Sequence, residues 1–172
     1  MRATALLLVA LGACSAAPGA GATDAQPTFL AFTPDFAQFR TWTSVHSDGP
    51  PTGTVPDDVL GPRTQYINHV PPAGAAEFPV GTIIVEAREN ALKKIFAGVK
   101  RGGDYNPQGA HDWEWFELNE TASGLVSLVW RGVGPPNGDT YGGDVNGCNV
   151  CHAACAANDY VCSPLLRLGS LR

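Results

Sequence analysis

The middle of the chain alternates short hydrophobic segments with clusters of Gly, Pro and Asp, a pattern that predicts β-strands joined by turns. In one segment, Trp113 and Trp115 fall on one face of the strand, and Phe116 and Leu118 fall on the other. Short connections between consecutive segments favour antiparallel pairing. The predicted strands are residues 63–70, 81–88, 91–100, 112–118 and 125–131.

The segment before these strands has a helical pattern. Thr33-Pro34 suits a helix start, with Thr as the N-cap and Pro at the first helical position. Phe36, Phe39 and Trp42 then repeat at helical spacing, which predicts a helix over residues 34–45.

The rest of the chain completes the expected fold class. Clusters of Gly, Pro and Asp predict loops at 47–62 and 132–147. Residues 145–168 carry four cysteines and are expected to be partly helical. We therefore expect an α+β fold, with an antiparallel sheet of about five strands flanked by helices and a C-terminal helix that carries the cysteines.

The first residues are expected to be an export signal. Met1-Arg2 gives a positive start, and the apolar run over 3–11 is too short to span a bilayer. Leu11-Gly12-Ala13-Cys14 then has the form of a lipoprotein cleavage site, which would leave a lipid on Cys14. Ordinary signal cleavage within 16–22 is the alternative.

These features divide the chain into a lipoprotein signal peptide (1–13), a flexible tether rich in Ala and Gly (14–27) and one domain (28–172). The mature protein is expected outside the bacterial cytoplasm, in the periplasm or, as a lipoprotein, on the outer membrane. No second long apolar run follows, so the lipid on Cys14 is the one predicted membrane attachment.

Composition narrows the choice of partners. The net charge is −5, and no basic block is present. Phosphate binding needs clustered Lys and Arg, so nucleic acid is not expected as a partner.

The cysteine pattern near the C-terminus indicates the chemistry. Cys148, Cys151 and His152 form a Cys-x-x-Cys-His motif, in which both thiols lie on one side of a helical turn and can reach one edge of a porphyrin. The imidazole of His152 would then be the proximal iron ligand. The motif predicts one covalently attached haem c.

Three alternatives to haem remain at this point. Cys148 and Cys151 could form a redox disulfide, although such motifs usually follow a strand of a parallel sheet. Zinc could be held by all four late cysteines, or by three of them with a histidine, although structural zinc sites usually have two separated ligand pairs. The third alternative is two structural disulfides.

Cys155 and Cys162 are candidates for a disulfide in an oxidising compartment. On one continuous helix they would lie about 10 Å apart along the axis. A disulfide needs Cα atoms within about 7 Å, so a bridge requires a break between the two cysteines. Asn158-Asp159 is the expected place for this break.

The sixth iron ligand is restricted by composition. Met1 is the one methionine, and it lies in the predicted signal peptide, so a His/Met electron carrier is excluded for the mature chain. His46, His69 and His111 are the candidates for a distal ligand, but a lone His is more often a surface residue. We therefore expect five-coordinate iron that is open to a small ligand.

A series of short motifs, in order along the chain, ends in the cysteine motif. They are Phe39-Arg40-Thr41-Trp42, Arg63-Thr64-Gln65-Tyr66-Ile67, Phe78 to Val85, Val99-Lys100, Asp112-Trp113-Glu114-Trp115-Phe116, and Cys148 to Arg167 with Asp159 and Pro164-Leu165-Leu166-Arg167. Over 36–168 the chain thereby resembles the cytochrome P-460 family, which includes the cytochromes c′-beta. The resemblance implies an antiparallel sheet flanked by helices, one c-type haem and often a homodimer.

Two departures from the family pattern affect the expected activity. Enzymatic members carry a lysine that cross-links to the porphyrin and a distal carboxylate, where this chain has Glu86 and Phe96 respectively. A phenylalanine at the second position resembles the c′-beta members, which bind nitric oxide in an apolar pocket. Phe96 is therefore expected against the haem. Glu86 is expected to face water at a strand end, with a role as distal base as the alternative.

Other residues could contribute to a haem pocket. Arg63, Lys100 and Arg101 could pair with haem propionates, with solvated charges as the ordinary alternative. Part of an aromatic group could form an apolar wall, with plain core packing as the ordinary alternative. This group is Trp42, Phe96, Trp113, Trp115, Phe116 and Trp130.

The expected function is binding of a small ligand such as nitric oxide, with a redox partner protein and a homodimer as further expectations. The alternatives are an oxidoreductase acting on hydroxylamine or nitrogen oxides, an electron carrier with two histidine ligands, and a domain with two disulfides and no haem. Whether the protein is an enzyme is left open by the sequence.

Overall fold

The computed structural model describes residues 26–49, 61–90, 92–136 and 147–171. The predicted signal peptide, the lipid site Cys14 and nearly all of the tether lie outside the described residues. So do most of the two predicted long loops.

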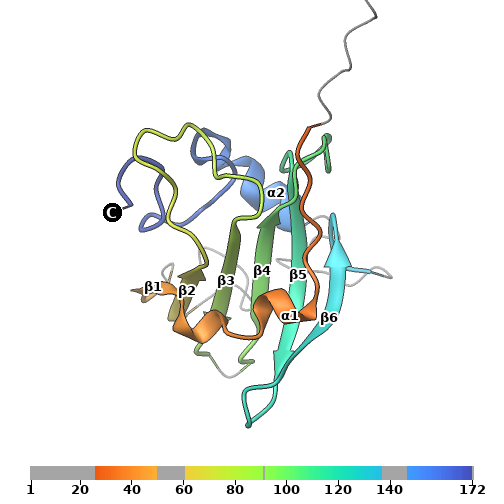
Figure 1. Ribbon diagram of the computed structural model, residues 1–172. Coiled ribbons are helices and arrows are strands. Elements are labelled where there is room, and N and C mark those ends of the chain that lie inside the picture. The colour runs from red at the N-terminus through yellow and green to blue at the C-terminus, as the bar shows by residue number, and fades with distance from the viewer. Residues whose placement is uncertain (1–25, 50–60, 91, 137–146, 172) are drawn as a thin grey trace, which may run out of the picture.

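Six strands form one antiparallel sheet in which each strand pairs with its neighbours in sequence (Figure 1). This confirms the expected antiparallel α+β architecture, with one strand more than predicted. The strands are β1 (Thr43–Ser47), β2 (Arg63–Ile67), β3 (Ile83–Arg88), β4 (Ile95–Lys100), β5 (Trp113–Glu120) and β6 (Val126–Gly132).

The predicted helix over 34–45 is wrong beyond its first turn. It is divided into α1 (Thr33–Phe36), the 3₁₀ turn η1 (Phe39–Thr41) and strand β1. Trp42 already has an extended backbone, and the next residues pair with β2. Thr43 and Val45 are β-branched and gain more from a sheet edge than from a helix. The helical spacing of the aromatic residues therefore reflects two successive turns that face the same core.

The start of β4 also differs from the prediction, because the preceding hairpin has its own turn chemistry. The side chain of Asn90 accepts hydrogen bonds from the N–H groups of Leu92 and Lys93. Lys93 has a left-handed backbone with φ of 48°. The chain can rejoin the sheet only after this turn, so β4 begins at Ile95.

The sheet has two covered faces, each with its own hydrophobic core. We call them the N-terminal face, which packs against the segment containing α1 and η1, and the pocket face, which packs against the C-terminal segment. Trp113 and Trp115 lie on the pocket face and Phe116 and Leu118 on the other, as the alternation predicts. In Figure 1 α1 crosses one face of the strands, and the blue C-terminal segment lies toward their upper end.

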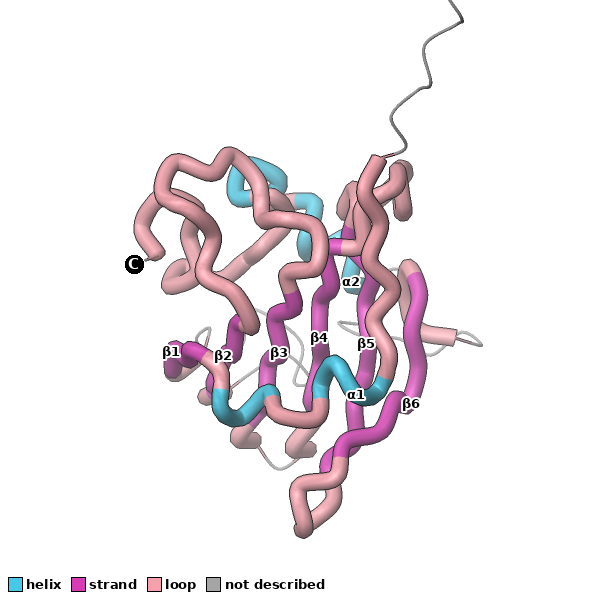
Figure 2. Tube along the Cα trace, viewed as in Figure 1, coloured by secondary structure: helices cyan, strands magenta, loops and turns pink. Residues whose placement is uncertain are grey.

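Helices are few in the described residues, so the expectation that helices flank the sheet is not confirmed. Figure 2 shows that loops and turns form most of the covering layers. The C-terminal segment contains α2 (Gly147–Ala153) and the 3₁₀ turn η3 (Ala156–Asn158). None of the described helices is long and apolar enough to cross a membrane.

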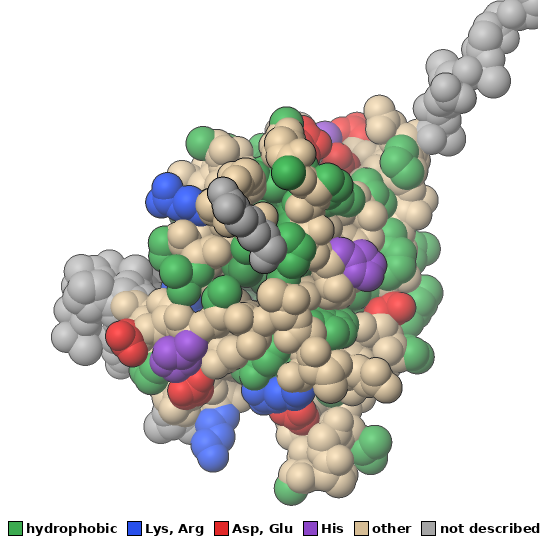
Figure 3. Space-filling view, turned by 60° about the vertical axis from the view of Figure 1, so that its left-hand side comes forward, with side chains coloured by type: hydrophobic (Ala, Val, Ile, Leu, Met, Phe, Trp, Pro, Cys, Tyr) green, Lys and Arg blue, Asp and Glu red, His purple; other side chains and the backbone are tan. Residues whose placement is uncertain are grey.

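Several large hydrophobic side chains remain exposed. They include Phe32, Leu125, Val129 and Val150. Figure 3 shows hydrophobic side chains reaching the surface at several separate places, between polar ones.

Candidate functional site

A pocket of about 260 Å³ lies between the pocket face of the sheet and the C-terminal segment. Residues from β2, β3, β4 and β5 form one wall. Cys148, Cys151 and His152 line the pocket from α2. The structure therefore brings the three residues of the motif to one cavity.

The two cysteines of the motif are not bonded to each other. Cys148 is half-buried and Cys151 is exposed, and both are free thiols in the structure. Burial raises the pKa of Cys148 to about 12, so its thiol stays protonated near neutral pH. Disulfide exchange needs a thiolate, so Cys148 does not have the properties of a redox-active thiol.

His152 is held by a backbone carbonyl and an indole ring. Its Nδ1 lies 2.5 Å from the carbonyl oxygen of Tyr160, and its ring centre lies 4.2 Å from that of Trp115. Burial lowers the pKa of His152, which favours a neutral ring that donates from Nδ1. Nε2 then carries the lone pair, and no described residue forms a hydrogen bond with it.

This arrangement is the one expected of a metal-binding histidine. A ligating imidazole usually donates its other N–H to a carbonyl or carboxylate, which fixes the tautomer and the ring orientation. The described site therefore contains two free thiols and one neutral imidazole whose Nδ1 is engaged by a backbone carbonyl.

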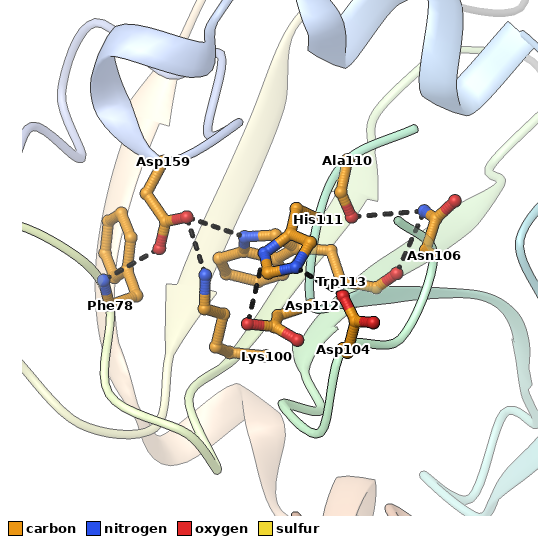
Figure 4. Close-up of polar contacts among 9 residues, drawn as sticks. All are labelled: Phe78, Lys100, Asp104, Asn106, Ala110, His111, Asp112, Trp113 and Asp159. Atoms are coloured by element: carbon orange, nitrogen blue, oxygen red, sulfur yellow. Dashed lines mark hydrogen bonds and ion pairs between the residues drawn. The ribbon is translucent and has the colours of Figure 1, made fainter. Parts of the chain in front are cut away.

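Helix α2 is anchored to the sheet by Asn149, which lies between the two cysteines. Its Oδ1 accepts hydrogen bonds from Trp115 Nε1 at 3.0 Å and from Asn106 Nδ2 at 2.8 Å. Asn106 Nδ2 also reaches the carbonyls of Ala110 and Trp113 (Figure 4). The side chain of Asn149 thereby sets the orientation in which α2 presents its cysteines.

A glycine makes this close approach feasible. A Cβ atom at Gly109 would lie 2.4 Å from Asn149 Cγ and 2.6 Å from Asn106 Oδ1. Neither Asn149 nor Gly109 was identified from the sequence, because nothing in their spacing distinguishes them from ordinary loop residues.

The chain reverses direction directly after α2, and a disulfide closes this reversal. Cys155 and Cys162 are bonded, with Cα atoms 5.2 Å apart. The break that the bridge requires falls where the sequence predicted it, because η3 ends at Asn158 and Asp159 has φ of 49°. Tyr160 is also left-handed, with φ of 63°. These two residues turn the Tyr160 carbonyl toward His152.

The pocket lining contains both residues at which the chain departs from the family pattern. Glu86 and Phe96 form a cross-strand pair between β3 and β4, and both line the pocket. Glu86 was expected to face water at a strand end, but it is paired with side chains of the pocket. Its carboxylate lies 3.0 Å from Arg63 Nε and 2.5 Å from an Arg88 nitrogen, and it accepts a hydrogen bond from Gln65 at 3.0 Å.

Within the described residues, His152 is the only histidine that lines the pocket. His46 lies near Asp48 and Glu89 at one edge of the sheet. His111 contacts Asp104 and Asp112, as Figure 4 shows. His69 is exposed after β2. The structure does not place any of these three candidates opposite His152.

The three candidate partners of haem propionates lie in different surroundings. Arg63 lines the pocket beside Glu86. Lys100 is paired with Asp159, and Arg101 is paired with Glu114.

The six aromatic residues considered for the haem pocket also lie in different places. Four of its six members line the pocket, whereas Trp42 packs with the N-terminal core and Trp130 with the core of the pocket face. The four are Phe96, Trp113, Trp115 and Phe116, of which Phe116 packs in the core of the N-terminal face.

The structure does not form the zinc site of four cysteines. Since Cys155 and Cys162 are bonded to each other, four free cysteines do not converge on one ion. The described part of the chain contains no cluster of three or more His, Cys, Asp or Glu side chains arranged to hold a metal ion.

No protein-family model, no curated protein and no solved structure matches this chain.

Proposed function

We propose that the protein is an exported c-type cytochrome that binds a small ligand such as nitric oxide. Cys148 and Cys151 would attach one haem, and His152 would provide the proximal iron ligand through Nε2. When bound, the haem iron would supply the atom to which the small ligand binds. Export, a lipid on Cys14 and a periplasmic or outer-membrane location belong to the same proposal and rest on the sequence.

The observation that carries this proposal is the convergence of the motif on one pocket. Both thiols are free, the imidazole is oriented by the Tyr160 carbonyl, and all three residues line the same cavity. The cavity wall also contains Phe96, Trp113 and Trp115, which suit a large apolar ring system.

The position of the other histidines supports a small ligand rather than a second protein ligand. His46, His69 and His111 lie elsewhere, and the mature chain is expected to have no methionine. Phe96 offers no atom that binds iron. Within the described residues no second histidine lines the pocket, so the proposal gives the ligand position to a molecule from solution.

The first test is the optical spectrum of the mature protein, exported together with cytochrome-maturation machinery. We expect one haem that survives denaturation, a high-spin ferric spectrum and a spectral change with nitric oxide. The Cys148→Ala/Cys151→Ala variant should lack covalent haem by intact mass. The matched control, Cys155→Ala/Cys162→Ala, should keep it. A colourless protein would contradict the haem, and a low-spin spectrum with two histidine ligands would contradict the open position.

A second candidate function is oxidation of hydroxylamine or another nitrogen compound, and Glu86 favours it. Such chemistry needs an acid–base group beside the reacting ligand. Glu86 is a carboxylate in the pocket, and Arg63 and Arg88 orient it.

Steady-state turnover of hydroxylamine with an electron acceptor separates the two functions. If Glu86 transfers protons, Glu86→Gln should lose most of the turnover. Glu89→Gln, at the exposed end of the same hairpin, should retain it. Absence of turnover in the unmodified haem protein would exclude this second function and leave ligand binding.

A further inference from the structure

Asp159 is a buried carboxylate outside the pocket, with partners from several parts of the fold (Figure 4). Its Oδ1 lies 2.6 Å from Lys100 Nζ on β4 and 3.4 Å from Trp113 Nε1 on β5. Its Oδ2 accepts a hydrogen bond of 2.9 Å from the backbone N–H of Phe78. Lys100 is only 2% exposed and Asp159 only 7%, so both charges are removed from water.

These contacts hold a backbone conformation that would otherwise be unfavourable. Asp159 and Tyr160 are successive left-handed residues, and a bulky residue such as Tyr rarely adopts this conformation. Strained backbone of this kind persists only where the surroundings determine it, and it is often linked to function.

The strained turn contacts His152 of the functional site through a backbone carbonyl. The Tyr160 carbonyl accepts the hydrogen bond from His152 Nδ1, and Asp159 immediately precedes it in the chain. The carbonyl cannot rotate freely, because the Asp159 side chain is fixed on one side and Cys162 is bonded to Cys155 on the other.

We propose that Asp159 is a positioning residue for His152. Together with Lys100, Phe78 and Trp113 it forms a clamp that holds the Tyr160 carbonyl against Nδ1, and so keeps Nε2 available on the other side of the ring. This inference rests on the proposed function for its consequence at the iron, but the orientation of His152 does not depend on haem.

The test compares two double variants that both lack the buried charges. Lys100→Met/Asp159→Asn keeps an oxygen that can accept from Phe78 N–H, and Asn tolerates the left-handed backbone. Lys100→Met/Asp159→Ala removes that acceptor. Because neither variant leaves an unpaired buried charge, both are expected to fold.

The readouts are the iron–histidine stretching vibration and the reduction potential of the haem protein. A hydrogen bond donated by Nδ1–H makes the imidazole a stronger electron donor. The Ala variant should therefore show a lower stretching frequency and a more positive potential, whereas the Asn variant should resemble the unmodified protein. Equal values in all three proteins would overturn the proposal.

A control distinguishes positioning from general loss of stability. Glu114→Gln weakens another buried ion pair, with Arg131 at 2.6 Å, on the N-terminal face of the sheet. It should leave both readouts unchanged, and an equal shift in this variant would overturn the positioning role. If the protein contains no haem, the proposed function fails, and ¹⁵N NMR of the His152 tautomer in the same variants tests the clamp on its own. One Nδ1–H tautomer in the Asn variant and a mixture in the Ala variant would support it, and identical tautomers would overturn it.

Discussion

At the scale of single residues, environment decides the behaviour of groups that look equivalent in the sequence. Cys148 and Cys151 belong to one motif, yet one thiol is half-buried and the other is exposed. Burial has the opposite effects on an acid and a base, because it raises the pKa of the Cys148 thiol and lowers the pKa of the His152 imidazole.

The two thiols should differ in reactivity whenever haem is absent. With a pKa of about 12 instead of 9.0, Cys148 has roughly one-thousandth of the thiolate of an ordinary thiol near neutral pH. In protein made without haem attachment, iodoacetamide should therefore modify Cys151 first, as mass spectrometry of the peptides can show. Equal rates at the two cysteines would contradict the burial of Cys148. In the haem protein neither thiol should react.

The Lys100–Asp159 pair gives a second prediction at this scale. Removing only the cation with Lys100→Met should lower the free energy of unfolding by about 3–5 kcal/mol near neutral pH, because it leaves a buried carboxylate unpaired. Burial already raises the pKa of Asp159, and loss of Lys100 raises it further.

The pH dependence follows from the sign of that shift. A carboxyl whose pKa is raised in the folded state binds its proton more tightly there than in the unfolded state. The cost of Lys100→Met should therefore be largest above the raised pKa and should shrink as the pH falls through it. Urea denaturation across this range, with Lys100→Met/Asp159→Asn as control, checks the prediction. A cost independent of pH would contradict it.

At the scale of elements, α2 is too short to be stable by itself, and its position depends on its contacts with the sheet. It spans only Gly147–Ala153. Asn149 supplies the polar anchor through Asn106 and Trp115, and Gly109 leaves room for it.

Asn149→Ala should therefore detach α2, whereas Val150→Ala should not. The first variant leaves buried partners without a hydrogen bond, which costs about 1–3 kcal/mol. Val150 is 58% exposed, and its truncation should change stability by no more than about 0.5 kcal/mol. Thermal unfolding of both variants measures this difference. Similar losses in the two variants would argue against Asn149 as the anchor.

At the scale of the whole molecule, two layers that are distant in sequence cover one sheet. The sheet itself follows chain order, but the pocket requires the C-terminal segment to pack against β2 to β5. The Cys155–Cys162 disulfide and the Asp159 clamp hold that segment, so stability should differ between the two layers.

Replacing both bridged cysteines by Ser should loosen the C-terminal layer selectively. Closing such a short loop contributes about 2–3 kcal/mol in the chain-entropy account. We expect faster hydrogen exchange over 147–171, with protection in β3, β4 and β5 largely retained. Uniform acceleration across the sheet would show instead that the bridge stabilises the molecule as one unit.

Patterns that depend on near neighbours were sufficient to predict much of the fold from the sequence. The alternation of short hydrophobic segments with turn residues predicted five of the six strands. It also predicted their antiparallel order, because hairpins pair segments that are close along the chain. The Cys-x-x-Cys-His spacing identified the candidate site, and helix geometry located the break between Cys155 and Cys162. The prediction of a helix over 34–45 was wrong, because two short turns produced a helical spacing of aromatic residues.

Only the tertiary structure decided what surrounds that site. Register pairing places Glu86 beside Phe96 in the wall, and a backbone carbonyl, which carries no sequence signal, orients His152. Lys100 and Asp159, far apart along the chain, meet as one buried pair. The sequence by itself determined the strand order and the three residues of the motif, because local spacing specifies both. The direction in which the imidazole points and the groups that face it were decided by long-range packing.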